Sequence, residues 1–396
     1  MATSLDGIKV LDFSQVYAGP FCTLLLRDLG AEIIKVERPE GGDTVRNTAP
    51  LTQGLESGIF IILNRGKKSI TVNLKSEKGR DICRELAKKV DVVVENFSSG
   101  IMDTLGLGSQ ELCKLNPKLI YASISAYGHT GPRRDDKGYD PVAQAMGGLT
   151  SVTGMPDTPT KCGVAIADFS TGLFTALSIV AALMYRMKTG EGQVIDMSLQ
   201  DSVWLLTSIE FSPHYFIDGK VPQRFGNGHP AMTPGNLYPA KDGSVRIDTG
   251  VLSQVERVYR AMGREDLIGT PLCSNQEERI KYREQIDALV TGWTKTRSTE
   301  EILSILKHAD VPCVKVPTFD EVCNDPHLIS REMIIEIEQT ISGKVKTPGS
   351  LFKLSKTPGN VNFPSPYLGE HNQEVYSSML GYTEQEIVNL ASDGII

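Results

Sequence analysis

Short apolar runs alternate with helix-like segments through residues 8–128, and this alternation limits the fold more than any other feature of the chain. The runs are rich in β-branched residues and are separated by turn and charge signals. They predict strands at residues 8–13, 31–37, 69–74, 91–97 and 119–128. Helices are predicted between them, over residues 20–29 and after a Ser76 N-cap. This succession of βαβ units predicts an α/β fold with a parallel sheet covered by helices.

The pattern changes beyond about residue 210. Before that point, an apolar helix is predicted over residues 169–188, followed by a strand and another helix. A Gly- and Pro-rich stretch comes next, and residues 235–249 have the pattern of a hairpin with its turn at 241–243. The helical segments and short strand that follow predict a second, smaller α+β domain.

Composition and motif spacing disfavour several classes of protein. The 396 residues carry a formal net charge of −7 without a block of either sign, so no nucleic-acid surface is expected. The 7 cysteines form no C-x-x-C pair and the 6 histidines lack metal-ligand spacing, so we expect no disulfide framework and no metal. The first predicted strand is followed by SQVYAGPF instead of G-x-G-x-x-G, which disfavours a nicotinamide or flavin cofactor.

The N-terminal residues do not have the pattern of a signal peptide, because no basic segment precedes an apolar one. The apolar stretch 174–184 is too short to span a bilayer. We therefore expect a cytoplasmic protein without a membrane segment.

Asp168 is the one acid at the start of the long apolar helix. As an N-cap it would stabilise a helix that begins at Phe169 by about 1 kcal/mol, and the local sequence alone favours this structural role. The alternative is a nucleophile, because a helix N-terminus lowers the pKa of a carboxylate and the flanking glycines leave the turn open.

Polar residues also follow several predicted strands, where ligands bind in open α/β sheets. Gln15 and Tyr17 follow the first strand and Arg38 follows the second. A basic and aromatic turn at 137–140 comes after the last strand of the first half. Each has a plain alternative as a helix cap or a solvated charge.

Several sequence segments, taken together and in their order along the chain, are more specific for a protein family than any one of them alone. These are GIKVLDFSQVYAGPFCTLLLRDLGAEIIKVERPEGGD, NRGKKSITVNLKSEKGRD, VVVENFSSG, KGYDPVAQAMGGL, ADFSTG and KTGEGQVIDMSLQDSV, with GNGHP, DPHLISREM and LGEHNQEV further on. Across essentially the whole chain they resemble the class III coenzyme A transferases, the group of formyl-CoA, carnitine and bile-acid CoA-transferases. That group also includes α-methylacyl-CoA racemases.

The resemblance implies a CoA-transferase in which Asp168 is the acyl acceptor, with aspartyl anhydride and aspartyl-CoA thioester intermediates. It implies that Gln15 and Tyr139 lie in the active centre. It also implies acyl-CoA and a carboxylic acid as substrates, with no other cofactor. The CoA-binding residues that it implies are Tyr17, Ala18, Arg38, Val72, Asn73, Leu74, Lys75, Asn96, Phe97, Ser98, Lys137, Gly138, Tyr139 and Asp140.

The chain departs from the family pattern in three places. Many members read ENFRPGVMDRLG where this chain has ENFSSGIMDTLG, so Thr104 occupies an arginine position. FGNGHPAMTP replaces the glycine run of formyl-CoA transferases, which disfavours formyl or oxalate specificity. Tyr139 takes the place of the racemase histidine, and a tyrosine, with a reference pKa of about 10, is a poor partner for proton abstraction and return. A racemase and a non-catalytic CoA-binding subunit remain the alternatives.

The resemblance further implies an interlocked, ring-like homodimer built from a Rossmann-like large domain and a small domain. We expect the large domain at residues 1–200, completed by 365–396, and the small domain at 225–325. Linkers are expected at 201–224 and 326–364.

Overall fold

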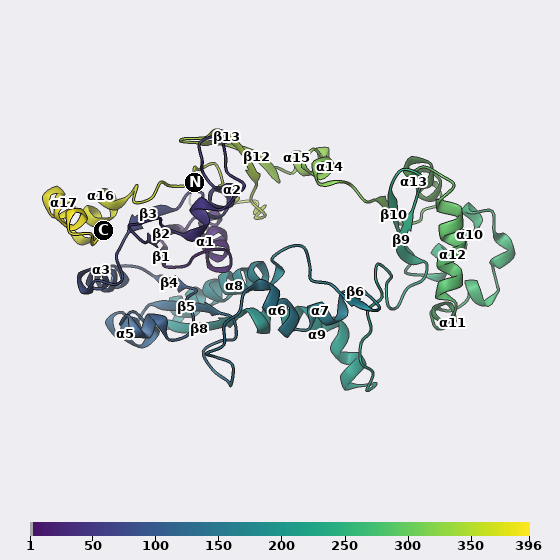
Figure 1. Ribbon diagram of the computed structural model, residues 1–396, viewed down its shortest axis with the longest axis horizontal. Helices are drawn as coiled ribbons and strands as arrows, with labels where there is room; N and C mark the ends of the chain where they lie inside the picture. Colours follow the sequence, from purple (N-terminus) through teal and green to yellow (C-terminus); the bar gives the residue numbers. More distant parts are fainter. Residues whose placement is uncertain (1–2) are drawn as a thin grey trace. The chain divides into compact units, whose positions relative to one another are not determined.

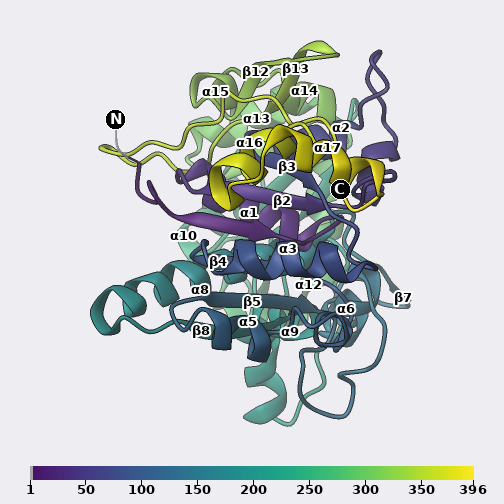
Figure 2. The same ribbon diagram turned by 90° about the vertical axis from the view of Figure 1, so that its left-hand side faces the viewer.

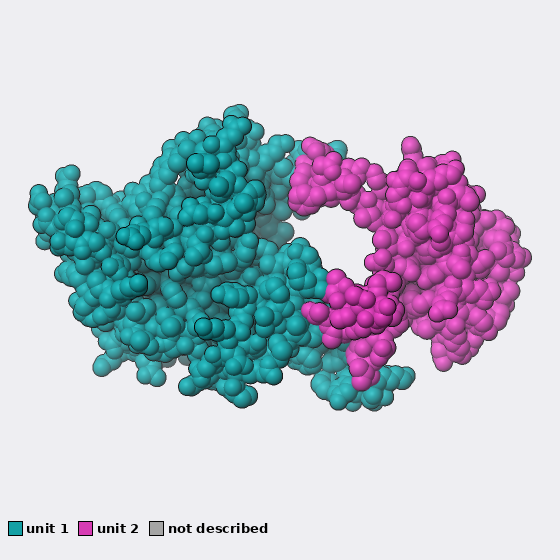
Figure 3. Space-filling view, in the orientation of Figure 1, with its two compact units in different colours: residues 1–149, 161–220, 326–396 teal, residues 150–160, 221–325 magenta. Residues whose placement is uncertain are grey.

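The computed structural model describes residues 3–396, which form two compact units (Figures 1 and 3). The first unit, teal in Figure 3, comprises the residues up to 149 together with 161–220 and 326–396. The second unit, magenta, comprises 150–160 and 221–325. Each unit contains its own clusters of buried apolar side chains.

A six-stranded parallel sheet forms the centre of the first unit, in the order β3-β2-β1-β4-β5-β8. Its strands are β1 (Lys9–Asp12), β2 (Glu32–Glu37), β3 (Lys68–Thr71), β4 (Val92–Glu95), β5 (Ile120–Ser125) and β8 (Gln193–Ser198). β4 and β5 are buried along their whole length, as expected of central strands covered on both faces. The predicted α/β fold with a parallel sheet is confirmed. This strand order is the doubly wound one, in which ligands bind where the order reverses, here between β1 and β4.

Helices cover both faces of the sheet because successive strand residues point to opposite sides. Val10 faces α1 (Ala18–Asp28) and α8 (Ile166–Thr189), whereas its neighbour Leu11 faces α3 (Glu77–Ala87) and α5 (Ser109–Leu115). The predicted N-cap of α3 is confirmed, since the Ser76 hydroxyl accepts the backbone N–H of Gly79 at 2.9 Å.

The C-terminal segment returns to the edge of this sheet. Helices α16 (Asn372–Val375) and α17 (Glu384–Ser392) flank a π-helical turn, η4 (Tyr376–Leu380), and lie beside β3 in Figure 2. The Tyr376 hydroxyl donates to the carbonyl of Thr71 at 2.7 Å, and the Asn372 side chain accepts the N–H of the same residue at 2.9 Å. These bonds satisfy the backbone of the outermost strand.

Helices α1 and α8 pack closely because one residue of α8 has no side chain. A Cβ on Gly172 would lie 2.5 Å from the carbonyl oxygen of Ala18, nearer than real Cβ atoms approach backbone. Among residues 3–396, α8 alone has the length and hydropathy of a membrane-spanning helix, but half of its most apolar window is buried inside the protein. Its packing on α1 and the sheet is that of a core helix.

The second unit is an antiparallel sheet with helices. Its strands β9 (Gly235–Pro239), β10 (Ser244–Asp248) and β11 (Cys313–Lys315) pair in the order β11-β10-β9, so the predicted hairpin is confirmed. The other elements of this unit are β6 (Gly154–Met155), β7 (Thr158–Pro159), α10 (Leu252–Ala261), η2 (Glu265–Leu267), η3 (Pro271–Cys273), α11 (Gln276–Lys281), α12 (Arg283–Thr294), α13 (Thr299–His308) and α14 (Phe319–Cys323).

Two segments expected to be linkers contain regular structure. Helix α9 (Leu199–Phe216) continues through most of 201–224, and the Ser198 hydroxyl caps its start by accepting the N–H of Asp201 at 2.9 Å. Residues 326–364 contain α15 (Pro326–Ser330) and a hairpin of β12 (Ile334–Gln339) and β13 (Gly343–Pro348). The remaining short elements are η1 (Thr44–Asn47), α2 (Gly58–Asn64), α4 (Ile101–Thr104), α6 (Asp140–Met146) and α7 (Leu149–Val152).

Candidate active site

A cavity of about 360 Å³ lies in the first unit where the strand order reverses. The segments after β1, β4 and β5 form its walls, together with the first turn of α8. It is lined by Gln15, Val16, Tyr17, Ala18, Asn96, Phe97, Ser98, Ser99, Ile124, Ser125, Ala126, Arg134, Asp136, Lys137, Gly138, Tyr139, Asp168 and Leu199. Residues that are far apart in the sequence are thus brought around one carboxylate, that of Asp168.

Asp168 is the third residue of α8 and not its cap. The helix begins at Ile166, its N-cap is Ala165, and the predicted start at Phe169 is therefore wrong. The cap comes from elsewhere in the chain, since the carboxylate of Asp140 accepts the backbone N–H of Ala167 at 2.8 Å. Local sequence could not indicate a cap supplied by a residue 27 positions away.

The carboxylate of Asp168 has no partner. Within residues 3–396 it has no hydrogen bond and no ion pair, although the residue is half-buried. Burial raises the pKa of Asp168 to about 7, and the negative charge of Asp140 adds to the rise. The expectation that the helix end would lower this pKa is therefore wrong, because burial and the charge of Asp140 raise it. An unpaired carboxylate at a cavity wall is available for bond formation.

A buried pair of polar side chains fixes the turn that precedes Asp168. Gln144 donates to the second carboxylate oxygen of Asp140 at 2.7 Å and accepts the N–H of Cys162 at 2.8 Å. The Gln144 side chain also donates to the carbonyl of Val164 at 3.2 Å. The resemblance implies a CoA contact for Asp140, whereas its carboxylate is buried and engaged in holding α8. Its neighbour Tyr139 is exposed and does line the cavity.

The opposite wall is the loop between β1 and α1. The ring of Tyr17 meets that of Phe169, the residue after Asp168, edge to face with centroids 5.9 Å apart. The Asn96 amide holds the backbone of Gln15 through two bonds of 2.8 Å, one to its N–H and one to its carbonyl. The loop after β4 therefore fixes the loop after β1.

A second cavity, of about 490 Å³, opens at the ends of β2 and β3. Arg38 and the predicted stretch Val72–Lys75 line it, together with Gln15 and Phe97, which also line the first cavity. The Arg38 guanidinium donates twice to the carbonyl of Gly42, at 2.9 and 3.1 Å, which fixes its position. Except for Asp140, every predicted CoA-binding residue lines one of these two cavities.

Some residues that line the cavities are not indicated by the sequence. Arg134 lines the first cavity and is not among the predicted site residues. A third cavity, of about 710 Å³, is lined by Glu95, Ser123 and His129, among others. Ser123 is hydrogen-bonded to Glu95, and its hydroxyl lies 2.5 Å from Nε2 of His129. Burial raises the pKa of Glu95 to about 7. The described chain brings no three His, Cys, Asp or Glu side chains into a metal-binding group.

The sequence and the fold both match known proteins. The family model of CoA-transferase family III matches residues 5–372. Succinyl-CoA–D-citramalate CoA-transferase of Chloroflexus aurantiacus is 36% identical over 99% of this chain and 98% of its own. Human succinyl-CoA:glutarate CoA-transferase is 35% identical over 99% and 90%, and formyl-CoA:oxalate CoA-transferase of Rhodopseudomonas palustris is 34% identical over 100% and 98%.

Among solved structures, a CAIB/BAIF family protein from Brucella suis superposes with a TM-score of 0.86 at 35% identity, over 96% of this chain and 100% of that chain. Rv3272 from Mycobacterium tuberculosis superposes with a TM-score of 0.84 at 29% identity, over 94% and 98%.

Proposed function

Because the chain belongs to CoA-transferase family III and is an acyl-CoA:carboxylate CoA-transferase, we propose that it transfers CoA through a covalent intermediate on Asp168. The observation that carries this proposal is the unpartnered carboxylate of Asp168 on the wall of the 360 Å³ cavity. A thioester does not exchange readily with a free carboxylate, and an enzyme carboxylate divides the exchange into easier steps.

In the first half-reaction, the Asp168 carboxylate attacks the thioester carbonyl carbon and CoA leaves as the thiolate. The product is a mixed anhydride between Asp168 and the acyl group. The thiolate then attacks the aspartyl carbonyl, the donor acid leaves as a carboxylate, and an aspartyl-CoA thioester remains. The acceptor carboxylate repeats these two steps in reverse order, which releases the new acyl-CoA and regenerates Asp168. Each step forms one acyl bond and breaks one, and no net proton is consumed.

The substrates that we propose are succinyl-CoA and a small dicarboxylic acid. Relatives at 35–37% identity are named as succinyl-CoA transferases for citramalate, glutarate and mesaconate. Arg134, which pairs with Asp135 at 3.3 Å, and Lys137 line the same cavity together with Asp136, and each cationic side chain offers donors to a substrate carboxylate. Mass spectrometry of CoA esters tests the proposal, with succinyl-CoA offered to each acid and with formyl-CoA and oxalate as the competing pair.

CoA itself is proposed to extend over both cavities. The nucleotide would lie against Arg38 and Lys75, and the pantetheine would pass Phe97 toward Asp168, since Phe97 and Gln15 line both cavities. An arginine and a lysine are suited to phosphate groups. Gln15 would orient the acyl group, and the exposed Tyr139 would close over it.

Lys75→Ala is expected to raise KM for the acyl-CoA about tenfold and to leave kcat within about twofold, because it removes binding that ground state and transition state share. Lys75 is exposed and lines the nucleotide cavity. Lys78, three residues on and also exposed, does not line that cavity, so Lys78→Ala is the matched control. Steady-state kinetics measure both variants, and equal KM values for the two would contradict the placement of the nucleotide.

The pH dependence should follow the ionisation of Asp168. Only the carboxylate attacks, and its pKa is raised to about 7, so kcat/KM for acyl-CoA should rise between pH 6 and pH 8 and then level off. Below the pKa the rate should fall about tenfold per pH unit. Acyl-CoA affinity measured over the same range is the control, and a flat profile through pH 6–8 would argue against this nucleophile.

Two alternatives remain distinguishable. A racemase would exchange the α-proton of a 2-methylacyl-CoA into deuterated solvent without an acceptor acid, whereas Tyr139 stands where that chemistry needs a better base. A non-catalytic subunit would show no turnover on its own, so activity of the purified chain excludes it.

We also propose a cytoplasmic, interlocked homodimer. Large apolar side chains on the adjacent helices α8 and α9 stay exposed in the single chain, and gathered exposed apolar side chains are typical of an interaction surface. They are Leu173, Leu177, Met184, Tyr185, Met187, Trp204, Leu205, Leu206, Ile209, Tyr215 and Phe216.

A further inference from the structure

The loop between β1 and α1 has a backbone conformation that its sequence does not favour. Val16, at its centre, has a φ of 68°, in the left-handed region. A β-branched residue is rarely found there, because its side chain crowds the neighbouring carbonyl oxygen. Such conformations persist only where surrounding contacts impose them, and they gather at functional sites.

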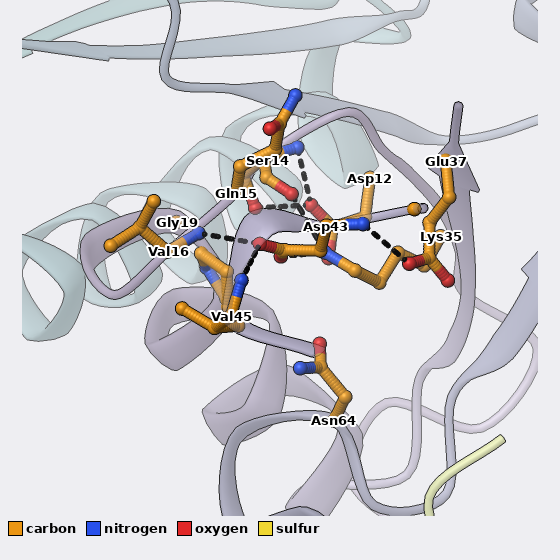
Figure 4. Close-up of polar contacts among 12 residues, drawn as sticks. Asp12, Ser14, Gln15, Val16, Gly19, Lys35, Glu37, Asp43, Val45 and Asn64 are labelled. Carbon is orange, nitrogen blue, oxygen red and sulfur yellow. Dashed lines mark hydrogen bonds and ion pairs between the residues drawn. The ribbon is translucent and has the colours of Figure 1, made fainter. Parts of the chain in front are cut away.

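The contacts that impose it are made by side chains from other elements (Figure 4). Asp43 accepts the N–H of Val16 at 3.2 Å through one carboxylate oxygen. Its other oxygen pairs with Lys35 at 2.9 Å, and the Lys35 ammonium donates to the carbonyl of Ser14 at 2.7 Å. With the Asn96 bonds to Gln15, these interactions hold the backbone from the Ser14 carbonyl to the Val16 N–H.

The ion pair is itself fixed from several sides. Both side chains are fully buried, so solvent does not weaken the attraction. The backbone N–H of Asp43 donates to Glu37 at 2.9 Å, and Glu37 is gripped by two bonds of 2.7 Å from Arg46. The loop also rests directly on α1, since a Cβ on Gly19 would lie 2.2 Å from that of Ser14.

We propose that Asp43, oriented by Lys35, is a positioning residue that keeps Val16 left-handed and thereby holds Gln15 and Tyr17 against the Asp168 cavity. Asp43 does not line that cavity, whereas Gln15 and Tyr17 do. The effect on turnover rests on the proposed function of Asp168. The effect on the loop does not.

Asp43→Asn is expected to lower kcat about 30-fold, with the affinity for CoA within about threefold, because an amide cannot accept from both Lys35 and the Val16 N–H. The decisive measurement repeats this substitution in a Val16→Gly background. Glycine adopts a φ of 68° without cost, so there Asp43→Asn should lower kcat less than threefold.

Leu55→Gly is the matched control background. Leu55 also has a positive φ, 60°, but it is exposed and lines none of the three cavities described, so it should leave the 30-fold effect unchanged. An equal loss with and without the Val16→Gly substitution would overturn the proposal, as would a folded Asp43→Asn protein with normal kcat. Should Asp43→Asn not fold, Asp43→Glu keeps the charge but displaces the carboxylate, and the same comparison applies.

Hydrogen exchange of the peptide that contains residues 13–17 needs no substrate. In Asp43→Asn, the Val16 amide should exchange at least tenfold faster than in the parent, and Leu55→Gly should leave it unchanged. Unaltered exchange overturns the positioning role even if CoA transfer is observed. Faster exchange in a protein that transfers no CoA would instead refute the proposed function alone.

Discussion

Asp168→Asn is expected to reduce CoA transfer by about 10⁴-fold or more while CoA still binds within about threefold of the parent. The amide has nearly the size of the carboxylate and lacks the nucleophilic charge. Since the Asp168 side chain has no partner in the described chain, its replacement breaks no structural bond. The loss should therefore appear in turnover and not in thermal stability.

Asp201→Asn is the matched control for this substitution. Asp201 is the third residue of α9, as Asp168 is of α8, but it is exposed and lines none of the cavities described. Its activity should equal that of the parent. A covalent test complements the kinetics: with acyl-CoA and hydroxylamine present, peptide mass spectrometry should find a hydroxamate at Asp168 and none at Asp140. Near-normal turnover of Asp168→Asn would remove the nucleophile from the mechanism.

Asp140→Ala is expected to lower kcat about 100-fold with a KM for acyl-CoA within about threefold. The resemblance to relatives implies a CoA contact, which would appear in KM, whereas the structure gives Asp140 the task of holding the first turn of α8. Loss of this cap should also reduce stability by about 1–2 kcal/mol, which thermal unfolding measures. A large rise in KM with kcat unchanged would favour the binding role.

Asp140→Asn distinguishes the effect of the negative charge of Asp140 from its role as the cap of α8. The amide oxygen can still accept the N–H of Ala167, but the negative charge that raises the pKa of Asp168 is gone. The ascending limb of the pH profile should therefore move to lower pH, toward the ordinary range of an aspartate. A limb that stays in place would show that burial alone sets this pKa.

The sequence predicts the sheet well because buried parallel strands are continuous apolar runs, as in VVVE and IYASIS. It also predicts helix ends where the cap is local. Ser76 is such a case, because its hydroxyl accepts the backbone N–H of Gly79 at the start of α3. The resemblance implies a set of CoA-binding residues, and all of them except Asp140 line one of the two cavities.

The rest depends on contacts between distant residues. The start of α8 is set by Asp140 and the conformation of Val16 by Asp43, and neither partner is near in sequence. A β-branched residue such as Val16 is rarely found in the left-handed region, so local propensity disfavours the observed loop conformation. The raised pKa of Asp168 follows from burial, which a helix-end argument does not contain.

The backbone of Gln15 is held by Asn96 through both of its peptide groups, and its side chain takes no part in that anchoring. Anchoring and the proposed substrate contact would therefore be made by different atoms of the same residue. Substitutions at position 15 can alter the shape and polarity of the cavity while the loop keeps its path. For redirecting the choice of acceptor acid by directed evolution, this is the position at which variation should be best tolerated.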